Sequence, residues 1–297
     1  MMMKGSVVAI GSFDGVHLGH QTLLKKLSEI AYERYLQPLA ITFKQHPLSI
    51  LAPEKEPPVI TELTAKIKLM EKMEVEPIVM EFTKSLSETK AKEWLFKLKN
   101  EFNTKVLLMG YDSTFGCDGK NLSPTDYKRL GQETGIEILE APMVPDISSS
   151  NVRKAISEGE IERASELMGH NFEITGKVVK GNQIGRSIGF PTANILPENN
   201  ILLPKQGVYV ASVFLPDGST WPAMVNVGCR PTIESGNNKV VETHIIGWDG
   251  NLYDQEIVIS FISRMRDEKK FDSINDLSEQ LLNDKRKALL ILDKREN

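Results

Sequence analysis

The sequence predicts two domains, an α/β domain with a parallel sheet and then an antiparallel β domain that ends in a helix. Three observations carry this prediction. Short β-branched runs alternate with segments of helical period in the first half, the pattern changes to strand-like alternation after Phe172, and an apolar stripe at helical spacing ends the chain. The 297 residues are enough for two hydrophobic cores. We expect the boundary near His170, with domains at 1–170 and 171–297.

Strands and helices alternate along the first half. The expected strands are Val7–Ile10, Leu39–Phe43, Ile78–Phe82, Val106–Met109 and Ile136–Leu139. The expected helices are His20–Glu33, Thr61–Met73, Ser87–Glu101 and Ser123–Thr134, the last with Ser123 as N-cap and Pro124 at the first helical position. Repetition of strand, helix and strand is typical of a parallel sheet. Two short helices, broken at Gly159, are expected over 151–170 and close this domain.

The second half has the signals of an antiparallel barrel or sandwich. Side chains alternate over 208–214 up to the turn Pro216–Gly218, and Trp248–Asn251 forms another turn between two β-rich runs. A final helix is expected to begin near Ser273, where Ser273 and Asp276 resemble a capping box. Its apolar stripe predicts that the helix packs on the β domain.

Composition limits the classes of partner and compartment. The net charge is −4, the isoelectric point is about 5.9, and the basic residues are spread along the chain, so no broad nucleic-acid surface is expected. The two cysteines, Cys117 and Cys229, form no C-x-x-C pair, which argues against a disulfide framework or a thiolate zinc site. The apolar run that ends at Gly11 is too short for a signal peptide or a membrane span. We therefore expect a cytoplasmic protein without nucleic-acid or membrane partners.

A turn rich in glycine and histidine follows the first expected strand. Gly11–His20 reads G-S-F-D-G-V-H-L-G-H and leads into a helix, which is where a doubly wound sheet binds phosphate. Gly15 and Gly19 let the backbone approach a ligand. His17 and His20 can donate hydrogen bonds to phosphoryl oxygens beside the positive end of the helix dipole, and so stabilise charge that develops at an α-phosphate. Two histidines that only cap a helix are the plain alternative.

This turn carries a resemblance to a known family. H-x-G-H in such a turn resembles the nucleotidylyltransferase superfamily, and F-D-G-V-H-L-G-H is similar to its FAD synthetase branch, the prokaryotic bifunctional riboflavin kinase and FMN adenylyltransferase family. The resemblance implies a Rossmann-like N-terminal domain. It implies catalysis by His17 and His20, and ATP binding by Gly11, Phe13, Asp14, Gly15 and Gly19. Two more segments, 42–47 and 110–116, look like this family, and they imply that His46 and Asp112 bind the flavin.

A further segment of this kind opens the helix after residue 147. The family usually reads S-S-T-x-I-R there, and this chain matches it with Ser148, Ser149, Ser150 and Arg153, a Ser replacing the Thr. The resemblance implies that these hydroxyl groups and the guanidinium hold the ATP phosphates. An ordinary helix N-cap after a polar turn is the alternative.

Two positions in the first half depart from the family pattern. Ser113 stands at the first Phe of G-x-D-F-x-F-G, and Lys44 and Gln45 replace the Asp and Pro of F-D-P-H-P. These departures predict altered contacts to the flavin or the adenine.

The second half begins with a stretch rich in glycine. Gly181–Asn194 reads G-N-Q-I-G-R-S-I-G-F-P-T-A-N, which is neither a Walker A loop nor a Rossmann fingerprint, so general rules leave a β-turn or a phosphate-binding flap. G-R-x-x-G-F-P-T-A-N resembles the signature of riboflavin kinases, and 226–232 and 241–244 look like two more of their motifs. The resemblance implies a riboflavin kinase-like barrel in which ATP phosphates contact Gly181, Gly185 and Arg186. It also implies that Thr192 and Asn194 bind Mg²⁺, for which oxygen ligands are suitable.

Glu242 is the general base that the resemblance implies for this half. A carboxylate that accepts the proton of a primary hydroxyl helps that hydroxyl to attack a γ-phosphate. Glu242 and His244 share one face of a strand, so a cross-strand polar pair is the simpler alternative. Arg266 is implied to bind flavin in the segment before the last helix, where a charged loop is an equally simple interpretation.

Together these motifs imply FAD biosynthesis in two Mg²⁺-dependent steps. Riboflavin and ATP give FMN in the C-terminal domain, and FMN and a second ATP give FAD and pyrophosphate in the N-terminal domain. The expected partners are the small molecules ATP, riboflavin and FMN, with a weak homo-oligomer permitted. Three rivals stay open: a monofunctional adenylyltransferase with a silent kinase half, a kinase with a slow or redox-selective adenylyltransferase, and a non-catalytic flavin- or nucleotide-binding regulator. An aminoacyl-tRNA synthetase is rejected because the chain has no K-M-S-K-S-like loop and no basic RNA-binding signal.

Overall fold

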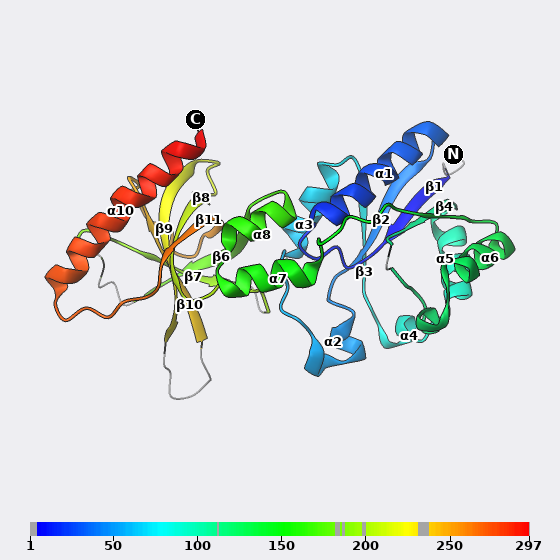
Figure 1. Ribbon diagram of the computed structural model, residues 1–297, viewed down its shortest axis with the longest axis horizontal. Helices are drawn as coiled ribbons and strands as arrows, with labels where there is room; N and C mark the ends of the chain where they lie inside the picture. The colour runs from blue at the N-terminus through cyan, green and yellow to red at the C-terminus, as the bar shows by residue number, and fades with distance from the viewer. Residues whose placement is uncertain are drawn as a thin grey trace. The chain divides into compact units, whose positions relative to one another are not determined.

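The chain folds into two compact units in the computed structural model (Figure 1). The structure describes residues 5–111, 113–181, 185, 188–197, 200–230 and 238–296, with the backbone alone at 229, 230, 238, 239, 295 and 296. Unit 1 consists of Met1–Val59 and Leu63–Ser148. Unit 2 consists of Ile60–Glu62 and Ser149–Asn297, so the two helices after residue 148 group with the second half.

Unit 1 is a parallel sheet with helices between successive strands. Its elements are β1 Ser6–Ile10, α1 Leu18–Arg34, β2 Gln37–Phe43, α2 Leu48–Leu51, η1 Pro53–Lys55, α3 Leu63–Glu71, β3 Glu76–Met80, α4 Lys84–Ser87, α5 Ala91–Phe102, β4 Thr104–Met109, η2 Gly119–Asn121, α6 Pro124–Thr134 and β5 Glu137–Glu140. The strand order is β3-β2-β1-β4-β5, and every pair is parallel. The direction in which successive strands are added therefore changes between β1 and β4. Sheets of this kind bind ligands beside such a switch point, at the carboxyl ends of the strands.

Both faces of this sheet are covered, because successive strand residues point to opposite sides. Val7 packs with α1 residues such as Leu24 and with Met70 of α3. Val8 packs with Trp94 and other residues of α5 on the opposite face. The doubly wound α/β domain that the alternating pattern predicts is confirmed.

Most element boundaries in unit 1 follow the expected local signals. Ser123 caps α6, because its Oγ accepts from the Asp126 backbone N–H while the Asp126 carboxylate accepts from the Ser123 N–H. The helix expected from Ser87 instead begins at Ala91, because 84–87 forms the separate short helix α4 with its own cap at Thr83. The strand expected at 78–82 lies two residues earlier, at 76–80.

Unit 2 is a closed antiparallel barrel with helices packed on it. Its elements are α7 Ser149–Glu158, α8 Ile161–Met168, β6 Phe172–Val179, β7 Ala193–Pro197, β8 Gly207–Phe214, β9 Thr220–Arg230, β10 Asn238–Ile245, β11 Glu256–Arg266 and α10 Ile274–Glu296. The order around the barrel is β10-β7-β6-β11-β8-β9, closed by pairing of β10 with β9. The barrel is confirmed and the sandwich is wrong.

Alternate strand residues fill the interior of the barrel, where the rings of Phe172, Tyr209 and Phe261 contact one another. The other strand face is outward, and part of it is covered by α10, whose Ala288 forms an apolar cluster with Val210 and Met224 of the barrel. Ser273 caps this helix through the Asp276 N–H, as expected. Among the helices of the described residues, none is long and apolar enough to cross a membrane.

Candidate active sites

The first candidate site is the turn between β1 and α1 in unit 1. Phe13 and Val16 have φ of 49° and 35°, although neither is glycine. Such left-handed residues cost about 1–3 kcal/mol each and concentrate where a ligand is held. Gly19 packs closely on His17, because a Cβ at position 19 would lie 3.2 Å from the His17 ring. The backbone of this turn is therefore tightly specified.

The two histidines of the turn lie against each other. His17 is the N-cap of α1, and its Nδ1 accepts from the His20 N–H at 3.3 Å. Their rings stack with centroids 3.7 Å apart, and Phe13 meets the His20 ring edge-on. Burial, and then the nearby His17 and Lys66, hold the pKa of His20 well below 6.5. His17 therefore does cap the helix, as the plain alternative expects. Capping does not explain His20, whose pKa favours the neutral form and whose buried Nδ1 has no hydrogen-bond partner among the described residues.

Lys66 is a residue of this site that the sequence analysis missed. It lies on α3 and is 7% exposed, and its Nζ donates to the Ser12 carbonyl at 2.9 Å. Thr42 Oγ1 donates to the same carbonyl at 3.1 Å. Burial lowers the pKa of Lys66, and the charge of Asp14 partly offsets this effect. A lone lysine in a helical segment gives no sequence signal, so only the fold reveals this buried cation beneath the turn.

The second candidate site lies on the outward face of the barrel in unit 2. Asn194 on β7 is directly opposite Glu242 on β10, although 48 positions separate them in the sequence. Asn194 is 6% exposed and Glu242 is partly exposed. Thr192 lies just before β7 and is exposed. The structure therefore brings the expected base and one expected metal ligand together on neighbouring strands.

Glycines and a histidine shape the segment in front of β7. A Cβ at Gly181 would lie 2.0 Å from Asn194 Nδ2, so only glycine leaves room for that amide. Gly185 closes a tight turn, since its carbonyl accepts from the Phe190 N–H at 2.8 Å. His244 is a further residue whose position the sequence did not explain. Its Nδ1 lies 2.8 Å from the Pro191 carbonyl, and burial lowers its pKa.

A pocket of about 290 Å³ opens beside Thr192. Its walls combine the barrel residue Thr243 with the loop that follows β10, including Trp248 and Tyr253. Thr243 is fully buried, and its Oγ1 has no hydrogen-bond partner among the described residues. Walls that mix polar and apolar groups, with one unsatisfied hydroxyl, are suited to a small organic ligand.

Comparisons with known proteins agree with this division into two sites. The family model described as FAD synthetase matches residues 1–155, and the model described as riboflavin kinase matches residues 168–292. The Bacillus subtilis (strain 168) protein named Bifunctional riboflavin kinase/FMN adenylyltransferase is 33% identical over 290 residues, covering 96% of this chain and 92% of that protein. The protein of the same name from Escherichia coli (strain K12) is 32% identical over 287 residues, covering 95% and 91%.

The chain belongs to the bifunctional riboflavin kinase/FMN adenylyltransferase family. The resemblance stated from the motifs is confirmed over nearly the whole chain. A crystal structure of a Streptococcus pneumoniae protein named Macrolide-efflux Protein matches with a TM-score of 0.87 and 30% identity, covering 95% of this chain and 93% of that one.

The positions that depart from the family pattern have specific contacts in this family member. Gln45 Nε2 donates to the Phe82 carbonyl at 3.1 Å. Ser113 packs closely on Gly110, because a Cβ added to Gly110 would lie 2.6 Å from Ser113 Oγ. His46 follows β2, and its Nδ1 accepts from the Leu48 N–H at 3.1 Å. Asp112, an expected flavin ligand, lies outside the described residues.

The remaining expected ligands of the family are distributed over both units. Ser148 is the last residue of unit 1, whereas Ser149, Ser150 and Arg153 lie in α7 of unit 2. These three residues are therefore not part of the site described in unit 1. Arg186 lies outside the described residues.

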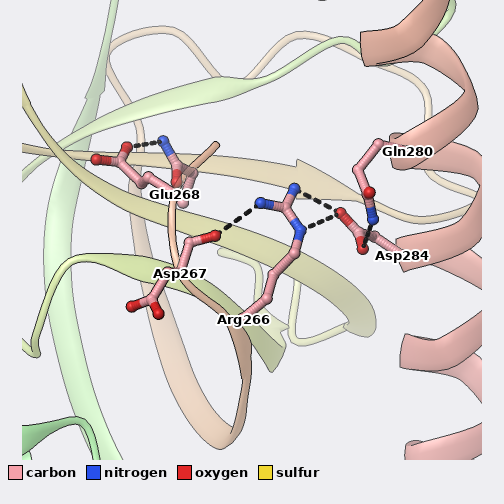
Figure 2. Close-up of polar contacts among 6 residues, drawn as sticks. Arg266, Asp267, Glu268, Gln280 and Asp284 are labelled. Atoms are coloured by element: carbon pink, nitrogen blue, oxygen red, sulfur yellow. Dashed lines mark hydrogen bonds and ion pairs between the residues drawn. The ribbon is translucent and has the colours of Figure 1, made fainter. Parts of the chain in front are cut away.

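Arg266 is committed to a structural ion pair. Its Nε and Nη2 donate to Asp284 Oδ2 at 2.9 and 2.7 Å, and its Nη1 donates to the Asp267 carbonyl at 2.9 Å. Figure 2 shows the guanidinium between the β11 end and α10. These hydrogen bonds stabilise the protein by joining β11 to α10. A role of Arg266 in flavin binding remains a prediction.

Proposed function

We propose that this chain makes FAD in two steps at two separate sites. In unit 2 the primary hydroxyl of riboflavin attacks the γ-phosphorus of ATP, and FMN and ADP are formed. In unit 1 a phosphate oxygen of FMN attacks the α-phosphorus of a second ATP, the bond to the β-phosphate oxygen breaks, and FAD and pyrophosphate are formed. The observation that carries this proposal is the match of one family model to each half of the chain, each over a structured candidate site.

For adenylyl transfer, the charge that develops on the α-phosphate needs donors that are already in position. The N-terminus of α1 and the His17–His20 pair supply such donors, and Lys66 supplies a fixed positive charge beneath the turn. Gly11, Phe13, Asp14, Gly15 and Gly19 shape the ATP-binding turn in this proposal. Ser148, Ser149, Ser150 and Arg153 are proposed phosphate ligands, and His46 and Asp112 are proposed flavin ligands.

For phosphoryl transfer, Glu242 accepts the proton of the attacking hydroxyl. Asn194 lies directly across from it, so the amide is placed to hold the nucleotide while Glu242 holds the alcohol. Gly181, Gly185 and Arg186 are proposed to contact the phosphates. The 290 Å³ pocket beside Thr192 has the walls to accept the adenosine part of ATP.

Mg²⁺ is a further part of the proposal for the kinase site. Thr192 and Asn194 offer oxygen ligands, and the missing side chain of Gly181 leaves the room that the Asn194 amide occupies. In this proposal the ion arrives with ATP and is held mainly by the ATP phosphates and by water. When bound, Mg²⁺ would neutralise phosphate charge.

Predictions about the domain bounds, the location and the partners also belong to this proposal. We assign the functional domains to 1–170 and 171–297, because the family models leave only residues 156–167 between them. A cytoplasmic location and a weak homo-oligomer, without nucleic-acid or membrane partners, remain predictions. Cell fractionation and light scattering would test them.

A product assay with two variants tests the proposal. The purified chain, given Mg²⁺ and ATP, should form FAD from either riboflavin or FMN. His20→Ala should stop at FMN when riboflavin is supplied, and Glu242→Gln should form FAD from FMN but not from riboflavin. Loss of both activities in either folded variant would contradict two independent sites. FAD from FMN alone in the unmodified chain would indicate a silent kinase half, and no turnover would favour the regulator.

A further inference from the structure

A row of three polar side chains crosses the outward face of the barrel at the kinase site. Glu242 on β10 lies opposite Asn194 on β7 and, on its other side, opposite Asn226 on β9. Residues opposite each other on antiparallel strands have Cβ atoms about 4.5–5.5 Å apart. Glu242 therefore has an amide on each side. The nucleotide accounts for Asn194, whereas nothing proposed so far uses Asn226.

The orientation of the Asn226 amide is fixed by a carboxylate. Asn226 Nδ2 donates to Glu268 Oε1 at 3.0 Å. The carboxylate reaches this position over a bare backbone, because a Cβ at Gly228 would lie 2.4 Å from the same Oε1. With Nδ2 directed to Glu268, Asn226 presents Oδ1 as an acceptor and its second N–H as a donor.

The segment that carries Glu268 is itself anchored. Figure 2 shows Arg266 joined to the backbone of Asp267 and to Asp284 on α10, with Gln280 on the other oxygen of Asp284. Asp284 is 1% exposed, so the carboxylate of this anchor is removed from water. Glu268 follows the anchored residues directly, and a fixed segment holds the Asn226 amide without a large loss of entropy on ligand binding.

We propose that Asn226 binds the hydroxyl-bearing chain of the alcohol substrate beside Glu242, and that Glu268 is the positioning residue for its amide. The inference rests on the proposed kinase function. Riboflavin carries its reactive hydroxyl at the end of a chain of hydroxyl groups. If the reactive hydroxyl lies on Glu242 and the nucleotide on the Asn194 side, that chain extends over Asn226. The Asn226 amide can accept a hydrogen bond from one hydroxyl group of this chain and donate a hydrogen bond to the next.

The test measures binding without turnover. Riboflavin fluorescence is titrated with the full-length chain in the presence of Mg²⁺ and ADP, so that no phosphoryl group can be transferred. Asn226→Ala should raise the Kd for riboflavin about tenfold, as expected for the loss of one or two hydrogen bonds. Lumiflavin, which keeps the ring and lacks the polyol chain, should bind both proteins equally. An unchanged riboflavin Kd, or an equal loss of both ligands, would overturn the inference.

A second pair of variants isolates the positioning role. Glu268→Ala should weaken riboflavin binding, whereas Glu268→Gln keeps an acceptor oxygen for Asn226 and should restore most of it. Glu279→Ala, which truncates an exposed Glu of α10, is the matched control, and FAD formation from FMN checks that each preparation is active. Equal weakening by Ala and Gln would remove the positioning role. A chain that binds riboflavin in this pattern but does not phosphorylate it would contradict the proposed function and not this inference.

Discussion

At the scale of single residues, Lys66 is expected to influence adenylyl transfer through the turn and through His20. Lys66→Met removes the bond to the Ser12 carbonyl and the positive charge that helps to hold the pKa of His20 low. We expect FAD formation from FMN to fall about tenfold to hundredfold, since small displacements of a positioned site are costly. The acid limb of its pH profile should move to higher pH, because His20 then gains a proton more readily. Initial rates across pH measure both effects.

Two variants separate this effect from general damage. Lys66→Arg keeps the charge and should keep the position of the acid limb. Lys68→Met changes an exposed lysine on the same helix and should leave the profile unchanged. The groups that face His20 are the His17 ring, the Phe13 ring and the Lys66 charge, so an unshifted profile in Lys66→Met would show that His20 does not control this limb.

The same scale shows what the sequence could and could not predict. His17 and His20 were identifiable because glycines and a strand-to-helix turn surround them. Asn194 and Glu242 were assigned from a resemblance, and only the barrel register places them opposite each other. Lys66 was missed, because its partner carbonyl is 54 positions away and a single helical lysine normally faces water.

At the scale of elements, α10 is held on the barrel by an ion pair as well as by apolar packing. Asp284→Asn leaves the Arg266 guanidinium without its carboxylate. We expect unit 2 to lose about 2–4 kcal/mol of unfolding free energy, less than for a fully buried pair because 20% of the Arg266 side chain is exposed. Urea unfolding followed by the fluorescence of Trp221 and Trp248, both in unit 2, measures the loss.

A double variant gives the control for this prediction. Replacement of the pair by Arg266→Met and Asp284→Leu leaves no unpaired charge and should recover much of the stability. If the double variant is as unstable as Asp284→Asn, apolar contacts cannot replace the pair, and hydrogen bonding to Asp267 and Gln280 matters more than the charge.

Elements were predicted well where local chemistry defines them and less well where packing does. The capping residues Ser123 and Ser273 begin their helices as expected. The start of α5 was wrong by four residues, because the helical period continues through α4 and does not show where the backbone turns. The barrel could not be separated from a sandwich by alternation alone, since closure depends on the β10–β9 pairing.

At the scale of the whole molecule, each unit contains a histidine whose removal from water favours its neutral form, half-buried at His20 and buried at His244. Burial is the largest cause of the lowered pKa at both His20 and His244, with the charges of Lys66 and Lys285 acting in the same direction and the Pro191 carbonyl opposing it at His244. Below the ordinary pKa of 6.5, the unfolded chain binds protons that the folded units resist. Stability is therefore expected to be full above this pH and to decrease as the pH falls below it, in both units.

Tryptophan variants allow each unit to be followed separately between about pH 7.5 and about pH 5.5, a window set by the ordinary histidine pKa. Trp94→Phe leaves reporters only in unit 2, and Trp221→Phe with Trp248→Phe leaves one only in unit 1. His20→Gln should reduce the pH dependence of unfolding in unit 1, and His244→Gln should reduce it in unit 2. Carboxylates with lowered pKa, such as Asp126 and Asp217, lose their contribution only at more acidic pH and do not interfere. An equal effect of either substitution on both units would mean that the two units unfold as one.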